Sequence, residues 1–324
     1  MVQQVQLTAT VTESQLGRRL DQVLAELFHE YSRSHIKEWI LDDRVQINDN
    51  VINKPKKKVL GGEVITMDVL IDEDIRWEAQ KIALDIIYED PDILVINKPV
   101  DLVVYPGVDN PDGTVLNALL NHFPAIADVP RAGIVHRLDK DTTGLMVVAK
   151  TVMAQTRLVE SFQVRDITRE YEAVAVGRMT DGGTVNQPIS RHSIKRTHMS
   201  VQPMGKPAIT HYQITGSFRN HTRLRLRLET GRTHQIRVHM AYVNHPLVGD
   251  KLYGGCPRLP KGISEELVTA LRTFDRQALH ATRLRLYHPI SRIEMEWNAP
   301  LPQDMVDLVE VLKLDAEVFT DQYY

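Results

Sequence analysis

The sequence predicts an α+β protein built from two domains, a small one followed by a larger one. Three observations support this prediction. The chain has 324 residues, more than one average domain needs. Apolar residues recur at helical spacing in some segments and alternate with polar residues in others, so helices and strands are both expected. An acidic, mostly polar stretch at 71–83 separates the two parts.

The first part, which we place at residues 14–75, has the pattern of two helices followed by a hairpin. Apolar residues recur at helical spacing from 20 to 28, and Ser32 or Ser34 can begin a second helix. The buried side of that helix is predicted to hold Ile36, Trp39 and Ile40. A hairpin turn is expected at 48–50, followed by a basic run at 54–58 and a strand at 63–69.

The second part, placed at residues 84–324, mixes strand and helix signals. Strands are expected at 92–97, 144–150, 170–177 and 222–230. Helices are expected from 113 to 120 with Thr114 as N-cap, from 152 to 162, and as an amphipathic segment over 302–314. In the strand at 222–230, Arg223, Arg225 and Arg227 alternate with leucines. This alternation fits a sheet with one solvent-exposed face, and it fits equally well a track of arginines for phosphates.

Charge is distributed unevenly along the chain. The net charge is −3, yet residues 131–240 hold 18 Lys and Arg against 8 Asp and Glu. A basic middle in an acidic chain indicates a surface for a polyanion. The single cysteine, Cys256, fits a reducing compartment and has no partner for an intrachain disulfide. No apolar run reaches membrane-spanning length and the first residues lack a signal-peptide pattern, so we expect a cytoplasmic protein.

The densest group of reactive side chains lies at 136–145, His-Arg-Leu-Asp-Lys-Asp-Thr-Thr-Gly-Leu. Asp139, Asp141 and Thr143 fit a D-x-D-x-T pattern, in which an aspartyl nucleophile works beside magnesium. That pattern wants an apolar strand before the first aspartate, whereas His136 and Arg137 stand there. The favoured alternative is a metal-free aspartate whose pKa is lowered by an arginine within about 4–6 Å. Zinc spacings, P-loops and dinucleotide fingerprints are not found in the sequence.

Residues 132–145 resemble the signature of the RluA family of RNA pseudouridine synthases. Supporting segments follow in the family's order, at 97–99, 169–171, 229–239 and 246–250. The resemblance covers about residues 84–300, and the small first part resembles an S-four-type RNA-binding domain. It therefore implies a pseudouridine synthase fold with a mixed, mainly antiparallel sheet, preceded by that small N-terminal domain.

The resemblance also implies roles for individual residues. Asp139 matches the catalytic aspartate, which acts either on the base or in elimination at the sugar. Tyr171 matches the active-site tyrosine, expected to stack on the uracil and to serve as the base at carbon 5; without the family it would be read as a strand aromatic. Arg237 matches the basic partner of the aspartate. Arg137 matches the arginine that enters the RNA helix when the base leaves.

Further residues are expected to contact the substrate or support the loop. Val248 matches the apolar position near the uracil, and Asp141 is expected to hold the loop by hydrogen bonds. Arg33 and Lys37, on the exposed side of the second helix, suit an RNA backbone, as do Arg223, Arg225 and Arg227. Asp101-Leu102 and Tyr105-Pro106 depart from the family's usual residues after Lys98-Pro99. Aspartate tolerates unusual backbone angles, so we expect this loop to be retained.

The resemblance implies isomerisation of uridine to pseudouridine, a reaction that needs no cofactor and no metal. Segments 7–41, 112–151 and 279–289 resemble members that modify ribosomal RNA. We therefore expect 23S ribosomal RNA or the assembling large subunit as partner, with the helix 69 stem-loop as the target. A monomer without membrane contact is expected. The competing hypothesis is a noncatalytic ribosome-assembly factor that only binds RNA.

Overall fold

The computed structural model describes residues 2–28, 31, 33–72, 77–107, 110–195, 197–255, 259 and 262–321. Cys256 and the predicted N-cap Ser32 lie outside the described residues. The chain divides into two compact units, Met1–Trp77 and Glu78–Tyr324. The boundary between them falls inside the acidic stretch at 71–83. Each unit has its own core and is described by itself.

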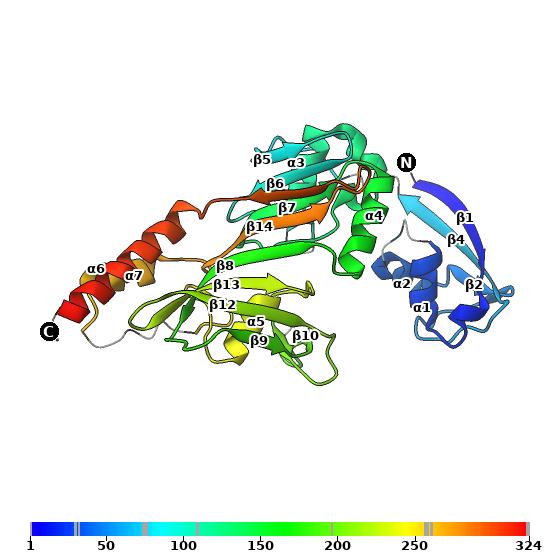
Figure 1. The fold of residues 1–324 in the computed structure, drawn as a ribbon. Helices are drawn as coiled ribbons and strands as arrows, with labels where there is room; N and C mark the ends of the chain where they lie inside the picture. Colours follow the sequence, from blue (N-terminus) through cyan, green and yellow to red (C-terminus); the bar gives the residue numbers. More distant parts are fainter. Residues whose placement is uncertain are drawn as a thin grey trace. The chain divides into compact units, whose positions relative to one another are not determined.

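The N-terminal unit is a four-stranded antiparallel sheet with two helices (Figure 1). Its strands follow the order β1 (Val2–Thr10), β4 (Val64–Asp72), β2 (Val45–Ile47) and β3 (Asn50–Val51). The helices are α1 (Leu20–Leu27) and α2 (Arg33–Leu41), and their apolar sides join the strands in one buried core. The two predicted helices and the hairpin are confirmed. Strand β1, which pairs with β4 over nine residues, was not predicted.

The larger unit is built on a nine-stranded sheet (Figure 1). Among the described strands, only the pairing of β7 (Thr143–Ala149) with β14 (Leu279–Tyr287) is parallel. The predicted α+β class with a mixed, mainly antiparallel sheet is therefore confirmed. The main path runs β5-β6-β7-β14-β8-β13-β12-β9, and β15 pairs with β14. The strands are β5 (Ile86–Glu89), β6 (Ile93–Lys98), β7 (Thr143–Ala149), β8 (Thr168–Val176), β9 (Gly183–Asn186), β12 (Ile209–Ser217), β13 (His221–Leu228), β14 (Leu279–Tyr287) and β15 (Glu294–Asn298).

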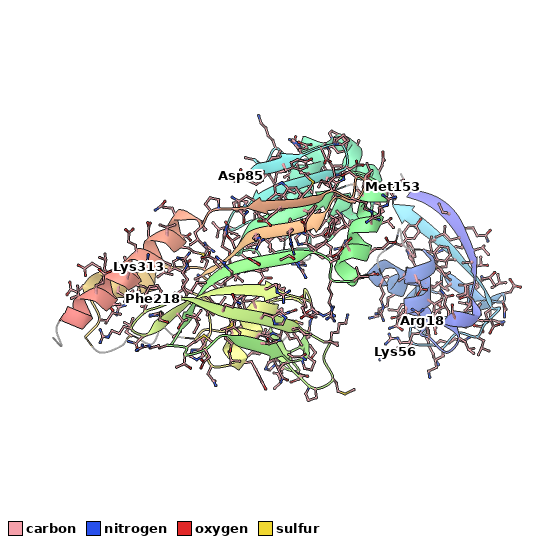
Figure 2. The ribbon with its side chains drawn as sticks, viewed as in Figure 1. Arg18, Lys56, Asp85, Met153, Phe218 and Lys313 are labelled. Carbon is pink, nitrogen blue, oxygen red and sulfur yellow. The ribbon has the colours of Figure 1, made fainter. Side chains whose placement is uncertain are left out.

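Helices and short elements complete this unit. Helix α4 packs its apolar side on β6, β7 and the β14–β15 hairpin. Helices α6 and α7 form a second core with Phe218, which lies beside α7 in Figure 2. The helices are α3 (Val115–His122), α4 (Val152–Gln163), α5 (Gln235–Tyr242), α6 (Glu265–Thr273) and α7 (Gln303–Asp321). The short elements are η1 (Glu13–Gln15, in the first unit), η2 (Pro124–Asp128), η3 (Pro130–Gly133), β10 (Ile189–Arg191) and β11 (Met199–Val201). Thr114 is the N-cap of α3, as predicted.

The alternation predicted for 222–230 is present in β13. Its leucines are buried and its arginines point to the opposite face of the sheet. There, Arg223 and Arg225 pair with Glu172 of β8, and Arg283 of β14 pairs with Glu170 and with Glu296 of β15. Opposite charges on neighbouring strands stabilise such a face. The structure therefore favours the solvent-exposed sheet face over the phosphate track.

Gly144 is required where β7 meets β14. Its φ is 116°, and a Cβ atom at this position would lie 2.2 Å from the carbonyl oxygen of Ala281. Backbone atoms on a paired strand cannot move aside cheaply, so we expect Gly144→Ala to lower the free energy of unfolding by about 3 kcal/mol or more. Gly107→Ala is the matched control, since a Cβ there meets nothing within 4 Å. Urea unfolding measures both; equal stability of the two variants would contradict the prediction.

Candidate active site

Asp139 lies on a loop between η3 and β7 whose entry is fixed by backbone conformation. Arg131, Ala132 and Gly133 all have positive φ angles, 55°, 49° and 69°. A Cβ atom on Gly133 would lie 1.7 Å from the carbonyl oxygen of Ala149, so only glycine allows this close approach to β7. The loop then turns at Asp139, whose carbonyl accepts the N–H of Thr142 at 3.1 Å. The local chain therefore holds Asp139 at the end of a buried strand.

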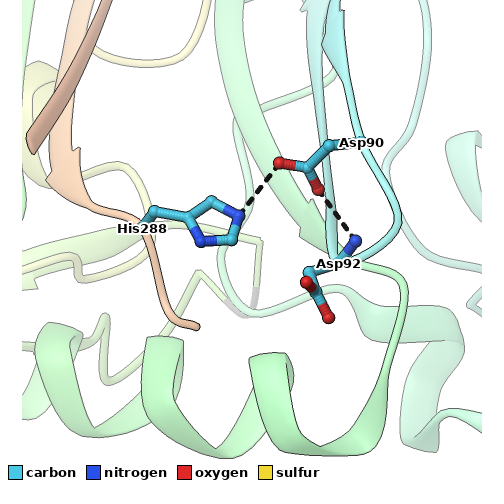
Figure 3. A group of neighbouring side chains, drawn as sticks. All are labelled: Asp90, Asp92 and His288. Atoms are coloured by element: carbon cyan, nitrogen blue, oxygen red, sulfur yellow. Dashed lines mark hydrogen bonds and ion pairs between the residues drawn. The ribbon is translucent and has the colours of Figure 1, made fainter. Parts of the chain in front are cut away.

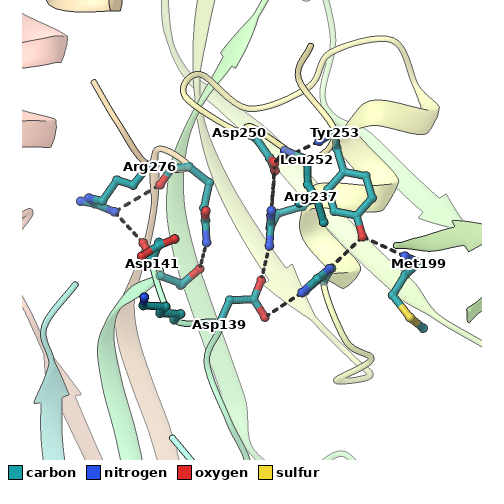
Figure 4. Close-up of polar contacts among 12 residues, drawn as sticks. Asp139, Asp141, Met199, Arg237, Asp250, Leu252, Tyr253 and Arg276 are labelled. Atoms are coloured by element: carbon teal, nitrogen blue, oxygen red, sulfur yellow. Dashed lines mark hydrogen bonds and ion pairs between the residues drawn. The ribbon is translucent and has the colours of Figure 1, made fainter. Parts of the chain in front are cut away.

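The Asp139 carboxylate is paired with Arg237 of α5. Arg237 Nη1 donates to Asp139 Oδ2 at 2.9 Å, while its Nε and Nη2 donate to Asp250 at 2.7 and 2.9 Å (Figure 4). Asp250 is 2% exposed and also accepts the N–H groups of Leu252 and Tyr253. Burial alone would lower the pKa of Arg237, but Asp250 and Asp139 raise it above its ordinary value. The arginine therefore stays charged and fixes one oxygen of Asp139.

His234, the N-cap of α5, faces the other oxygen of Asp139. Its Nε2 lies 3.9 Å from Asp139 Oδ1, and its Nδ1 is 2.7 Å from the Tyr253 hydroxyl. That hydroxyl accepts the N–H of Met199 at 2.9 Å, so it donates its own proton to His234. Burial lowers the pKa of His234, which fits a neutral ring with its proton on Nε2. Among the described residues, Asp139 Oδ1 accepts no hydrogen bond, which leaves it available for reaction.

Tyr171 lies in β8, directly opposite Leu226 of β13. It is 6% exposed, and its hydroxyl has no hydrogen-bond partner within the described part of the chain. Burial raises the pKa of Tyr171; nearby Arg169 opposes this shift and the Asp139 charge adds to it. The tyrosine thus has a free hydroxyl close to Asp139. A buried strand aromatic without this role would normally find a hydrogen-bond partner.

Asp139, Tyr171, Arg237 and Arg137 line one cavity of about 610 Å³, although they come from segments far apart in the sequence. Arg137 is exposed at its rim and has no ion pair with any described residue. Six arginines and two carboxylates line the cavity: Arg131, Arg137, Arg165, Arg169, Arg232, Arg237, Asp139 and Glu229. This excess of positive charge is the part of the basic middle segment that gathers around the candidate active site.

Four predicted contact residues lie elsewhere. Val248 is not among the residues that line this cavity; it packs in the core with Phe218 and α6, because its backbone pairs with Val174 and Ala278. Arg223, Arg225 and Arg227 lie on the opposite face of the sheet from Tyr171, since strand neighbours alternate between faces. RNA bound at this cavity cannot contact those arginines from the same side. These four positions are therefore corrected and left out of the site.

Asp141 holds the loop by a hydrogen bond, as predicted, but the bond is made by its backbone and not by its carboxylate. Among the described residues the carboxylate makes no hydrogen bond; the backbone carbonyl of Asp141 accepts from Arg276 Nη1 at 3.2 Å instead (Figure 4). Arg276 also binds Asp304 of α7 with two hydrogen bonds. The loop is thus anchored through its backbone. Asp101, in the loop that departs from the family's usual residues, has a φ of 62°, in line with the expectation for an aspartate there.

Lys98 is 1% exposed and ties two loops together. Its Nζ donates to the carbonyls of Pro99, Leu102 and Lys140 at 2.7, 2.9 and 2.8 Å. Lys140 follows Asp139 directly, so the bond from Lys98 to the Lys140 carbonyl helps to hold the Asp139 loop in place. Burial lowers the pKa of Lys98 to about 7, while Asp141 and Asp139 oppose that shift.

We expect Lys98→Met to lower the free energy of unfolding by about 2–4 kcal/mol at pH 7, because three buried carbonyls lose their donor. The difference in the free energy of unfolding between the wild type and Lys98→Met should widen as the pH rises from 7 toward about 10. The unfolded chain keeps the lysine proton up to its ordinary pKa of 10.5, whereas the folded chain releases it near 7, so higher pH favours folding. Denaturant titrations at the two pH values test this, with exposed Lys81→Met as control. If this difference in the free energy of unfolding became smaller as the pH rises, the prediction would be contradicted.

One group in the described chain could hold a metal ion, namely Asp90, Asp92 and His288 (Figure 3). Hydrogen bonds already account for it. His288 Nε2 donates to Asp90 Oδ2 at 2.9 Å, and His288 Nδ1 accepts the N–H groups of Ile290 and Ser291. Asp90 Oδ1 accepts two backbone N–H groups. Both ring nitrogens are therefore engaged, and the group joins two turns of the sheet.

Comparison with known proteins assigns this geometry to a family. A family model described as RNA pseudouridylate synthase matches residues 92–242, and an S4 domain model matches residues 18–65. "Ribosomal large subunit pseudouridine synthase D" of Salmonella typhimurium is 74% identical over 321 residues, covering 99% of this chain and 98% of that protein. The chain belongs to the RNA pseudouridylate synthase family. The predicted family and the predicted enzyme class, an isomerase, are confirmed.

Other members of the pseudouridylate synthase family are also similar to this chain, in sequence or in structure. The protein of the same name from Escherichia coli strain K12 is 72% identical over 322 residues, covering 99% of each chain. The solved structure of human RNA Pseudouridylate Synthase Domain Containing 4 superposes with a TM-score of 0.54 at 26% identity, covering 70% of this chain and 92% of that one. The solved structure of human RNA Pseudouridylate Synthase Domain Containing 1 superposes with a TM-score of 0.52 at 28% identity. It covers 69% of this chain and 86% of that one.

The unit of this synthase that the S4 model matches has a basic groove. Lys37 is exposed and lines it, and Arg33 lines it while donating two hydrogen bonds to buried Asp21. Burial would raise the pKa of Asp21, but Arg33 and Arg19 outweigh it and lower the pKa. Three lysines of the basic run also line the groove: Lys54, Lys56 and Lys57. The run was visible in the sequence, although its lysines were not predicted as contacts.

Two residues of the synthase site were missed by the sequence reading. His234 lies inside the segment 229–239, and Tyr253 follows Asp250 by three residues. Only the fold brings the Tyr253 hydroxyl to His234 and the His234 ring toward Asp139. Within the described part of this family member, every helix is too short or too polar to span a bilayer.

Proposed function

We propose that this protein converts uridines of 23S ribosomal RNA to pseudouridine, with the helix 69 stem-loop as the target. Support for ribosomal RNA comes from the relatives that cover its whole length, which are named ribosomal large subunit pseudouridine synthases. The helix 69 assignment rests on the resemblance of segments 7–41, 112–151 and 279–289 to members that modify ribosomal RNA. The protein acts in the cytoplasm as a monomer, on RNA or on the assembling large subunit.

Asp139 is the proposed nucleophile. The single observation that carries this role is the Asp139–Arg237–Asp250 chain, because it fixes one carboxylate oxygen and leaves the other unbonded toward the cavity. A carboxylate placed in this way suits attack on an electrophilic carbon without a metal. Neutral His234 lies beside the free oxygen, with its Nε2 atom 3.9 Å from Asp139 Oδ1.

Tyr171 and Arg137 have supporting roles in this proposal. The unbonded Tyr171 hydroxyl is placed to stack with the uracil and to take the carbon-5 proton. Arg137, exposed and unpaired within the described chain, fills the gap left when the target base leaves the RNA helix. Extruding a base costs a few kilocalories per mole, so a side chain that replaces it in the stack lowers that cost.

The N-terminal unit, which contains the domain predicted at residues 14–75, holds the RNA backbone through its groove. Lys37 and the lysines of the 54–58 run provide charge without base contacts, and Arg33 shapes the groove through Asp21. Phosphate contacts of this kind position RNA but do not read its sequence. The catalytic domain, placed at 84–324, then receives the uridine.

Tritium release from 23S ribosomal RNA labelled at carbon 5 of uracil tests this function, because pseudouridine formation frees that hydrogen. We expect release by the wild-type protein in the presence of EDTA. Release that requires magnesium would restore the metal-dependent aspartyl alternative. Binding of RNA without any release would support a noncatalytic assembly factor and contradict the proposal.

A further inference from the structure

Arg169 is a buried cation that has no counter-ion among the residues that the structure describes. It is 9% exposed, lies in β8 two residues before Tyr171 on the same face, and lines the candidate active-site cavity. Within the described part of the chain it makes no ion pair and no hydrogen bond, and its Nε is buried without an acceptor. A buried arginine in such a state costs several kilocalories per mole unless something else balances its charge.

Within the described residues, the groups in contact with Arg169 supply no negative charge. Its guanidinium lies 5.1 Å from the centre of the Phe162 ring, and a Cβ on Gly231 would lie 2.8 Å from its Nη1. His136, also nearby, is neutral: its Nε2 accepts the N–H of Val147 at 3.0 Å, and burial together with Arg169 lowers the pKa of His136 to about 3.

The carboxylates that line the cavity are already paired. Asp139 is bound by Arg237, and Glu229 is bound by Arg165 and His211 at 2.7 Å each. An ionised Tyr171 would raise the pKa of Arg169, but burial raises the pKa of Tyr171 and keeps its hydroxyl protonated. The cavity therefore contains a fixed positive charge aimed at whatever enters it. Perturbed, uncompensated charges of this kind are typical of functional sites.

We propose that Arg169 binds the oxygen atoms of the target uracil and stabilises the negative charge that the ring carries during isomerisation. This inference rests on the function proposed above. Arg169 and Tyr171 share one strand face, so a uracil ring stacked on Tyr171 brings its edge to the guanidinium. A donor already in place in a water-poor site is the most effective stabiliser of developing charge.

The charge arises by either route open to Asp139. In elimination at the sugar, Asp139 takes the C2′ proton, a C1′–C2′ double bond forms, and the C1′–N1 bond breaks. The electron pair of that bond passes to the ring, where it spreads onto O2 and O4. In addition to the base, the Asp139 oxygen bonds to C6 and the ring electrons move to O4. In the elimination route, C5 then bonds to C1′ while C2′ takes its proton back from Asp139. In the addition route, the C1′–N1 bond breaks, C5 bonds to C1′, and the Asp139–C6 bond breaks last. In both routes the C5 proton leaves to a base and N1 takes up a proton. The ring oxygens are thus the anion that Arg169 meets.

RNA phosphates fit this position less well. Phosphates lie on the outside of an RNA helix, and the cavity rim offers them exposed cations such as Arg131 and Arg137. Arg169 is only 9% exposed and lies against the Phe162 ring and Gly231, so we expect an extruded base to reach it more readily than a backbone phosphate.

Two variants, Arg169→Met and Arg169→Lys, test the inference with the full-length protein and tritium-labelled 23S ribosomal RNA. We expect Arg169→Met to lower the single-turnover rate at saturating RNA by about 100-fold or more, with Arg169→Lys in between. The RNA dissociation constant should not change. The melting temperature should stay the same or rise, because an unbalanced buried charge is removed. Arg157→Met, in which a bond to the Pro289 carbonyl is lost outside the cavity, is the control.

Three results would overturn the inference: an unchanged rate, a weakened RNA affinity with an unchanged rate, which indicates a phosphate contact, or a large fall in melting temperature, which indicates a structural ion. The failure of the proposed function can be distinguished from these. If wild-type protein releases no tritium, the function itself is wrong. If wild type and Arg169→Met release it equally, only the role of Arg169 is wrong.

Discussion

Asp139→Asn is expected to abolish pseudouridine formation, with a fall in rate of at least about 1,000-fold. The amide keeps the size of the side chain but loses the charge and the nucleophilic oxygen, while Arg237 remains bound to Asp250 by two hydrogen bonds. The loss should therefore be chemical, not structural. Quantitative mass spectrometry of nucleosides from RNA treated with each protein measures it.

Asp141→Asn is the matched control for this prediction. Its carboxylate lies two residues away and makes no hydrogen bond among the described residues, while the loop is held by the Asp141 carbonyl and Arg276. We expect a rate within about threefold of the wild type, as for a substitution that removes no transition-state contact. If Asp141→Asn were the inactive variant and Asp139→Asn the active one, the assignment of the two carboxylates would be reversed.

Asp250→Ala is expected to be the most destabilising single change in the site, at about 3–5 kcal/mol. Asp250 is fully buried in its side chain and accepts four hydrogen bonds, two from Arg237 and one each from the N–H groups of Leu252 and Tyr253. Its removal leaves the buried guanidinium with Asp139 alone. Activity should fall as well, because without Asp250 the Arg237 side chain is no longer held in place and so no longer fixes the Asp139 carboxylate. Denaturant unfolding together with tritium release measures both effects.

Two further variants separate charge imbalance from lost packing. Asp275→Ala removes an exposed carboxylate paired with Lys251, and should change stability by less than about 0.5 kcal/mol. Arg237→Met combined with Asp250→Leu removes both buried charges, so it should recover stability relative to Asp250→Ala without recovering activity. If the double variant were less stable than Asp250→Ala, the Arg237–Asp250 ion pair itself, and not the unpaired charge of Arg237, would determine stability.

Local sequence patterns were sufficient for most elements of the fold. The alternation in β13 and the apolar run of β6 predicted buried strands, and Thr114 marked the start of α3. Strand β1 was missed although apolar and polar residues alternate in it, because its partner β4 lies far along the chain, with Thr10 opposite Val64 and Val2 opposite Asp72. Neither the order of strands in the sheet nor the parallel pairing of β7 with β14 is encoded in local spacing.

The candidate site was predicted where a continuous motif carries the residue and was missed where the fold assembles it. The resemblance named Asp139, Tyr171 and Arg237, and in the structure these three residues line one cavity. It could not indicate that Asp250 is the second partner of Arg237, since the two carboxylates come from separate segments. Val248 was misplaced because its side chain direction depends on backbone pairing with β8. Arg169 lies in the segment 169–171 that supports the family resemblance. That its charge is unbalanced becomes evident only from the structure, where its Nε is buried without a hydrogen-bond partner.

Mapping pseudouridines in ribosomal RNA from cells that lack this protein tests the central claim most directly. We predict that the pseudouridines of helix 69 in 23S RNA disappear, that wild-type protein restores them, and that Asp139→Asn does not. Retention of all helix 69 pseudouridines, with loss confined to a transfer RNA or to another ribosomal RNA, would contradict the proposed function.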